Sequence, residues 1–219
     1  MTETELLTWA RGPGFQIASI IFALGIMLRL GEILMLGRKA NLAEAKGSAM
    51  SSGLRTVFSR TVPDAATFKR SAFTVTAGYI FHIGLFVVIF LFAPHILFFK
   101  DLLHVSWPAL PSPVIDATSV ITIITLVIVL VHRLRDPVKR FLSNYDDYLG
   151  WFVTILPLIT GYIAFHRVGM TAPSLIAIHL LSVQLLMVVF PFTKLMHAFT
   201  IFLARWYNGA ISGYRGVQS

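Results

Sequence analysis

Four histidines lie inside apolar stretches of the sequence: His82, His95, His179 and His197. A polar, titratable side chain within a membrane span is costly to bury and is a candidate functional group. Imidazole is the commonest metal ligand among side chains and exchanges protons near neutral pH. The four histidines therefore predict either metal ligation or proton handling inside a membrane.

His179 and His197 are 18 residues apart in one apolar stretch. On a continuous helix this spacing is five turns and about 27 Å, so both rings point the same way. The hydrocarbon core of a bilayer is about 30 Å thick. We therefore expect one helix to present a histidine near each face of the membrane.

The elements that must position these histidines are apolar spans. A mean hydropathy of +0.77 with only 13% charged residues indicates an integral membrane protein with one helical domain, residues 1–219. The expected fold is an all-α bundle of five transmembrane helices. The spans are predicted at about 15–36, 72–99, 114–131, 148–165 and 174–204. Residues 1–13 have no basic n-region or cleavage site, so we expect the first span to be retained.

Basic residues set the expected orientation. The loop 37–71 has seven of them, the loop 133–147 has four and the tail 205–219 has two. With Arg29 and Lys194 this face has fifteen, whereas the opposite face has three. The positive-inside rule then predicts an outside N-terminus and a cytoplasmic C-terminus, in a multi-pass protein of the inner (cytoplasmic) membrane.

The composition also restricts partners and cofactors. The net charge of +8 comes from loops between spans, which favours contact with membrane lipid and protein partners and not with nucleic acid. There are no cysteines, which excludes disulfides, covalent c-type haem attachment and an iron–sulfur cluster held by this chain. Any redox centre in the chain must therefore be ligated by histidine.

The predicted orientation places the four histidines in two pairs of equal depth in the membrane. His82 and His197 fall in the inner half of spans two and five, and His95 and His179 fall in the outer half. A haem b iron takes two axial imidazoles from facing helices, so each pair would hold one haem b.

The outer pair has a geometric difficulty. His95 follows His82 by thirteen residues, which is about 20 Å of rise and about 220° of rotation on an ideal helix. Pro94 predicts a kink that re-aims the His95 ring. Gly78 and Gly84 flank His82 and suggest room for a flat macrocycle.

Three further histidines have other expected roles. His166, at the end of span four, and His104, in the loop after span two, are rival outer ligands. His132, beside Arg133, is interpreted as an interfacial residue. Arg29 lies three residues before Glu32, and either snorkels toward the inner face or neutralises a buried anion such as a haem propionate.

Two motifs carry a family resemblance. His179, followed by Pro191-Phe192-Thr193-Lys194-Leu195-Met196-His197, resembles the last membrane helix of the respiratory nitrate reductase gamma subunit. That family has a histidine eighteen residues before the one that ends a P-F-[ST]-[RK]-L-x-H motif. Phe81-His82-Ile83-Gly84 is similar to the F-H-x-G of its second helix, and the likeness extends over residues 12–207.

The resemblance implies a dihaem cytochrome b that exchanges electrons between a quinone pool and a cytoplasmic iron–sulfur partner. By position, His82 and His197 would ligate the inner haem and His179 the outer haem. The nitrate reductase pattern places its other outer histidine where this chain has Phe92. With His95 instead, the chain is more similar to cytochrome b subunits of sulfite-reductase-linked, heterodisulfide-reductase-like and nickel–iron hydrogenase complexes.

The function that follows is an electron-transfer subunit of a respiratory oxidoreductase complex, which is not a complete enzyme alone. Menaquinone or ubiquinone would bind near the outer haem, beside Trp107 and the loop 100–113. A heterodisulfide-reductase-like iron–sulfur subunit, with other redox subunits, would dock on the basic loops. Arg29 and Lys194 would neutralise the inner haem propionates. Candidate proton-transfer groups are Lys100, Asp101, His104 and Asp116.

Two other functions are compatible with the same sequence. A non-haem transporter or proton channel would line a polar path with the histidines. Spans three and four offer no matching intramembrane acids and the chain has no internal repeat, which disfavours that function. A purely structural anchor would not require in-register histidines and ranks last.

Overall fold

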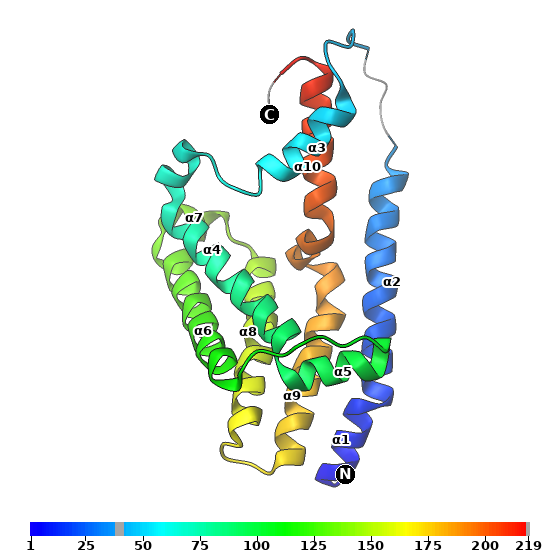
Figure 1. Ribbon diagram of the computed structural model, residues 1–219, viewed down its shortest axis with the longest axis vertical. Coiled ribbons are helices and arrows are strands. Elements are labelled where there is room, and N and C mark those ends of the chain that lie inside the picture. The colour runs from blue at the N-terminus through cyan, green and yellow to red at the C-terminus, as the bar shows by residue number, and fades with distance from the viewer. Residues whose placement is uncertain (38–41, 218–219) are drawn as a thin grey trace. The chain divides into compact units, whose positions relative to one another are not determined.

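The computed structural model describes residues 1–37 and 42–217, and within them it is helical without strands (Figure 1). Five helices are long and apolar enough to cross a membrane, which confirms the predicted all-α membrane class. They cover Glu3–Met35, Ala65–Leu91, Ser112–Arg135, Tyr145–His166 and Ala172–Phe192. Arg38 and Lys39, two bases counted for the orientation, lie outside the described residues.

The chain divides into two compact units. The first consists of Met1–Ser19 and Phe73–Val188, and the second of Ile20–Ala72 and Val189–Ser219. The first unit contains α1 (Glu3–Arg11), most of α4 (Ala65–Leu91), α5 (Ala93–Leu103), α6 (Ser112–Arg135), α7 (Pro137–Leu142), α8 (Tyr145–His166) and nearly all of α9 (Ala172–Val189). The second contains most of α2 (Pro13–Met35), with α3 (Ala49–Ser59) and α10 (His197–Tyr214).

The core of the first unit forms between α6 and α8. Leu126 of α6 is buried with Ile155 and Leu158 of α8, and apolar side chains of α4 pack against them. At Gly84 of α4, an added Cβ would lie only 2.0 Å from the Thr122 hydroxyl oxygen of α6. Gly84 therefore permits a helix–helix contact, and its interpretation as room for a macrocycle was wrong.

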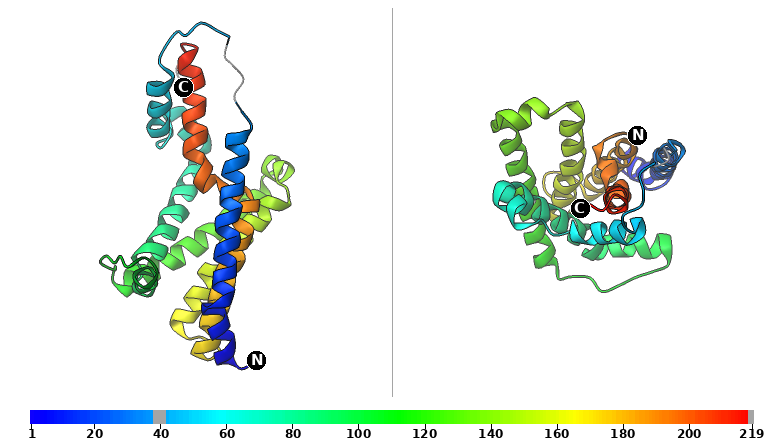
Figure 2. Two further views of the ribbon diagram at one scale, coloured as in Figure 1. Left: turned by 90° about the vertical axis from the view of Figure 1, so that its right-hand side faces the viewer. Right: turned by 90° about the horizontal axis from the view of Figure 1, so that it is seen from above.

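The second unit is held together by small residues. Helix α3 lies along α10 (Figures 1 and 2). A Cβ at Gly209 or Gly213 of α10 would overlap Thr56 or Ser52 of α3, at 2.2 and 2.0 Å. Helix backbones approach this closely only where side chains are absent. The 42–72 segment therefore includes a packed helix that begins at Ala49.

The predicted second span ends earlier than expected. Helix α4 stops at Leu91, Phe92 has an extended backbone (φ −85°, ψ 127°), and α5 begins at Ala93 with Pro94 in its first turn. Proline fits a first turn because its missing N–H has no intrahelical acceptor there. Figure 1 shows α5 turning away from the line of α4. The expected change of direction at Pro94 is therefore confirmed as a complete helix break.

The predicted fifth span is interrupted. Helix α9 ends at Val189, two 3-10 turns follow at Phe190–Phe192 and Lys194–Met196, and α10 begins at His197. Pro191 cannot donate an α-helical hydrogen bond, and Thr193 has an extended backbone (φ −126°, ψ 175°). The expectation that one unbroken helix carries His179 and His197 in register was wrong, because five whole turns require continuous α-helical geometry.

Candidate functional site

The first unit brings together His95 from α5 and His179 from α9. Their ring centroids are 6.1 Å apart and their ring planes differ by 16°. Both residues are half-buried. The break between α4 and α5 starts a new helix just before His95, so the rotation expected for a continuous helix does not apply. The two residues are the outer pair of the sequence analysis.

The end of α4 fixes the His95 ring. The last carbonyls of a helix have no intrahelical donor and need other partners. The Val88 carbonyl oxygen is 2.9 Å from Nδ1 of His95, and the Phe90 carbonyl accepts a hydrogen bond from the Trp107 indole. Because a carbonyl oxygen only accepts, Nδ1 of His95 carries the hydrogen. In the neutral ring the lone pair is then on Nε2.

The His179 ring is fixed by α8. Its Nδ1 is 3.3 Å from the Thr160 hydroxyl oxygen, which itself donates to the Leu156 carbonyl at 2.9 Å. The Thr160 oxygen is therefore an acceptor for Nδ1–H, and Nε2 again keeps the lone pair. Gly161 allows the ring to lie against α8, since a Cβ there would be 2.9 Å from Cε1 of His179.

Neither Nε2 atom of this pair is fully buried. Within the described residues neither takes part in a hydrogen bond, and no buried side-chain nitrogen or oxygen is left unpaired. Each Nε2 is therefore not buried. Metal-ligating histidines commonly donate their other ring N–H to a carbonyl or similar acceptor, which fixes the tautomer. The arrangement is chemically suited to binding a metal ion through two Nε2 atoms.

The other predicted ligands share this pattern. Nδ1 of His82 is 2.7 Å from the Gly78 carbonyl oxygen, and Nδ1 of His197 is 2.8 Å from the Lys194 carbonyl oxygen. His82 lies in the first unit and His197 in the second. Their ring tautomers are therefore the same as those of His95 and His179, and their pairing stays a prediction.

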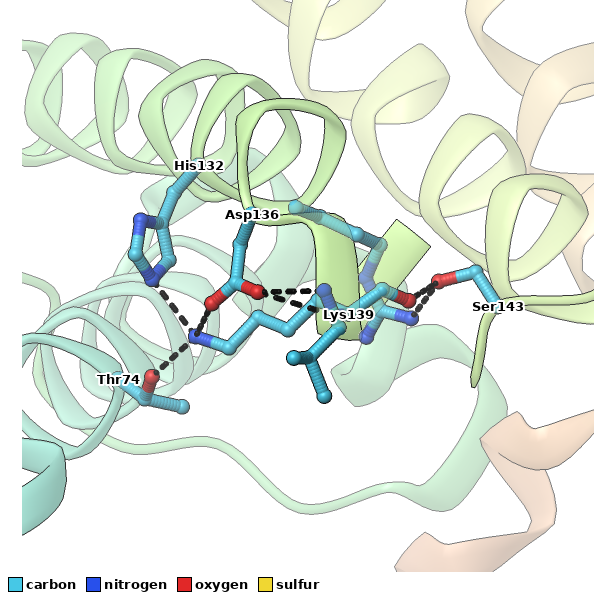
Figure 3. Close-up of polar contacts among 7 residues, drawn as sticks. Thr74, His132, Asp136, Lys139 and Ser143 are labelled. Atoms are coloured by element: carbon cyan, nitrogen blue, oxygen red, sulfur yellow. Dashed lines mark hydrogen bonds and ion pairs between the residues drawn. The ribbon is translucent and has the colours of Figure 1, made fainter. Parts of the chain in front are cut away.

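His132 uses its other ring nitrogen. Its Nε2 is 2.6 Å from the Lys139 ammonium, which also donates to the Thr74 hydroxyl at 3.0 Å and lies 3.9 Å from Asp136 (Figure 3). An ammonium group only donates, so the lone pair of His132 on Nε2 is already occupied. The contact joins α4, α6 and α7 and fits a structural role.

The two rival outer ligands, His166 and His104, do not lie against His179. Nε2 of His166 is 2.6 Å from a carboxylate oxygen of Asp116. His104 is exposed and ends α5 with a left-handed backbone (φ 58°). It is the His95 ring that lies against His179 in the described residues.

The predicted anion partners lie in the second unit. Arg29 forms an ion pair with Glu32 at 2.8 Å, as their spacing predicts, and its Nε donates to the Pro191 carbonyl at 3.2 Å. Arg29 thus holds a carbonyl that the interruption of the fifth span has released. Lys194 is exposed, and its carbonyl is the acceptor for His197. Their contact with a propionate stays a prediction.

Sequence reasoning missed the groups around His179. Thr160 and Gly161 lie on the neighbouring span, and Ser182 donates to the His179 carbonyl at 2.7 Å with its hydroxyl oxygen 2.8 Å from that of Thr160. The available signal was a Thr-Gly pair in span four near the depth of His179. Depth alone, however, does not tell which helix face it occupies.

The fold and its composition define a multi-pass, all-helical membrane protein with a pair of adjacent histidines. The chain is 32% identical over 139 residues to a protein of Nitratidesulfovibrio vulgaris strain Hildenborough, whose name specifies no function. The alignment covers 64% of this chain and 61% of that relative. No family model and no solved structure matches.

Proposed function

We propose that the chain is the membrane-anchoring dihaem cytochrome b subunit of a respiratory redox complex. It would move electrons between the quinone pool and a cytoplasmic iron–sulfur subunit. The observation that carries this proposal is the His95–His179 pair, with each Nδ1 held by the protein and each Nε2 lone pair available. The motifs around His82 and His197, which resemble those of dihaem cytochromes, supply the second pair.

The ring separation supports ligation by a single iron. A bond between a metal and an imidazole nitrogen is about 2 Å long. If both histidines held one metal ion through Nε2, their ring centroids would lie about 6 Å apart. The observed separation is 6.1 Å. An offset stack of two uncharged rings spans a similar distance, so the haem content decides between these two arrangements.

A bound haem b supplies one-electron redox chemistry. The residues of this chain orient and tune it: Val88 and Thr160 fix the tautomers of the outer pair, and Gly161 makes room for the His179 ring. His82 and His197 would hold the inner haem, with Arg29 and Lys194 beside its propionates. The quinone would bind near the His95–His179 pair.

Exposed bases support a docking role for the second unit. Five lie in the 42–72 segment: Lys46, Arg55, Arg60, Lys69 and Arg70. Asp64 and Glu44 are its acids. Such a surface attracts an acidic protein face and speeds the encounter. We infer that a heterodisulfide-reductase-like iron–sulfur subunit docks here on the cytoplasmic side of the inner membrane.

The experiment is a reduced-minus-oxidised optical spectrum of the purified full chain, with a pyridine haemochrome count. We expect two b-type haems per chain. His82→Ala and His197→Ala should each remove one haem and leave the same remaining spectrum, because the two residues serve one iron. A colourless protein would overturn the proposal and favour a histidine-lined transporter. Different remaining spectra would overturn the pairing.

A further inference from the structure

A carboxylate–imidazole pair joins two helices of the first unit outside the histidine pair. Asp116 is in the first turns of α6 and His166 is the last residue of α8. Their closest atoms, Oδ1 and Nε2, are 2.6 Å apart, and their side chains are 34% and 36% exposed. The Tyr162 ring lies 4.4 Å from the His166 ring. Asp116 and Tyr162 are thus two ionisable groups in contact with His166.

Aromatic rings connect this pair to His95. Phe165 precedes His166 and meets Phe92 edge-on, with centroids 5.2 Å apart. Phe92 in turn meets His95 edge-on, also at 5.2 Å. The Phe165 side chain is 44% exposed. An apolar ring packed against Phe165 would lie beside the Asp116–His166 pair. Only the Phe92 ring separates Phe165 from His95.

We infer that Asp116 and His166 are the proton-exchanging residues for a lipid-soluble hydroquinone; this inference rests on the proposed function. Asp116 accepts the Nε2–H of neutral His166, which leaves the His166 lone pair on Nδ1. The O–H bond of the hydroquinone breaks and its proton forms an N–H bond at Nδ1. The products are a quinolate anion and an imidazolium that Asp116 stabilises.

The proton returns by the same route in the opposite direction of turnover. A group that abstracts a proton from the hydroquinone also delivers one to the quinolate. The carboxylate keeps the imidazole in one tautomer in both directions. Asp116 is thus a positioning residue, and His166 is the one that meets the hydroxyl.

A purely structural staple between α6 and α8 is the competing explanation. A staple contributes to stability but does not affect how the rate depends on pH. The two roles therefore separate when hydroquinone-driven reduction is compared with reduction by a reagent that transfers no proton.

The test uses the full chain in membranes, with menadiol as hydroquinone and dithionite as direct reductant. In Asp116→Asn and His166→Gln we expect haem reduction by menadiol to slow about 100-fold near neutral pH. The haem count and the dithionite-reduced spectrum should not change. Binding of menadione, followed by tryptophan fluorescence quenching, should stay within about twofold, because only the proton-transfer step is lost.

The pH profile and two further variants complete the test. The wild-type rate should rise with pH, because only the neutral ring of His166 accepts the proton, and His166→Gln should lose that rise. Asp116→Glu, which keeps a carboxylate, should regain part of the rate. Asp146→Asn removes a carboxylate at the other end of α8 and serves as the matched control.

Each contrary result points to a distinct failure. Normal menadiol rates with two haems present would overturn this inference and leave the proposed function intact. Loss of haem in Asp116→Asn and His166→Gln would identify a structural staple and overturn the inference. A wild-type chain without haem would overturn both proposals.

Discussion

Two histidine regions of the first unit differ in which ring nitrogen the protein holds. At the His95–His179 pair, both Nδ1 atoms face oxygen acceptors and both lone pairs are on Nε2. At His132, Nε2 faces the Lys139 ammonium, and the lone pair is consumed by that contact. The residue type and the tautomer are the same, so what separates a histidine ready to bind a metal from a structural one is whether a neighbouring helix already occupies the Nε2 lone pair.

The surroundings of the two regions differ in charge as well. Neutral groups surround His179, namely the Thr160 and Ser182 hydroxyls and the Gly161 backbone. His132 belongs to a charged cluster in which Lys139 contacts Asp136 (Figure 3). The neighbouring Arg133 pairs with Asp147 at 3.1 Å. Charged contacts of this kind close the ends of helices, whereas a neutral setting leaves an imidazole free to donate its lone pair.

The largest expected effect tests this difference directly. His179→Ala should reduce the pyridine haemochrome count from two haems to one per chain, because one of the two histidines that would hold that haem is lost. His132→Ala is the matched control and should keep both haems, since its ring is bound to Lys139. Equal haem counts in the two variants would show that His179 and His132 do not differ in haem binding. A loss confined to His132→Ala would show that the roles are assigned the wrong way round.

Span positions were predictable because hydropathy is a local property. The predicted span 114–131 lies within Ser112–Arg135, and 148–165 lies within Tyr145–His166. The break before His95 was also predictable, because Pro94 signals it in the sequence. These features need no knowledge of neighbouring helices.

The interruption at Phe190–Met196 was not predicted, although Pro191 is visible in the sequence. Prolines are tolerated in membrane helices when neighbours satisfy the released groups. Pro157 shows this, since α8 continues through it. At Pro191 the chain leaves the helix, Arg29 binds the released carbonyl, and Gly25 makes room for the proline ring. These tertiary contacts are invisible to a reading of local sequence.

The tautomers were also beyond the sequence. The acceptor for His179 is on α8, and the acceptor for His95 is at the end of the preceding helix. Which side chain faces which acceptor depends on helix rotation, and apolar residues all around a span leave that rotation undefined. The sequence thus identified the histidines but not the nitrogen that each presents.

A smaller effect is expected when a substitution shifts the His179 ring without removing it. In Gly161→Ala the new Cβ would lie 2.9 Å from Cε1 and 3.2 Å from Nδ1 of His179, so the ring must shift by a few tenths of an ångström. We expect both haems to bind, with incomplete occupancy at this pair and an altered spectrum of that haem alone.

Gly31→Ala is the matched control for that substitution. Apart from its chain neighbours and the nearby backbone of its own helix, no atom of the described residues lies within 4 Å of a Cβ built at Gly31. The change should leave the spectrum as it is and stabilise α2 by at most about 1 kcal/mol, through helix propensity. An unaltered spectrum in Gly161→Ala would show that the contact between α8 and His179 does not position the ring.

The smallest expected effect belongs to the charged region. Asp136 caps α7 by accepting the backbone N–H groups of Val138 and Lys139 at 3.0 and 3.1 Å. The Lys139 N–H hydrogen bond holds the pKa of Asp136 below its ordinary value of 3.8. Because the folded-state pKa is lowered, the stabilisation is fully present above that value and is lost as the pH falls through the folded-state pKa.

Asp136→Asn should therefore slightly lower the thermal unfolding temperature at neutral pH, and the difference from the wild type should disappear in acid. The effect is small because asparagine is itself a good N-cap and the carboxylate is exposed to solvent. Unfolding temperatures of both proteins across the acid range measure it, alongside the optical spectrum. If the haem held by His95 and His179 changed in parallel with this loss, the neutral and charged regions would be coupled, and the separation of roles drawn from their Nε2 lone pairs would fail.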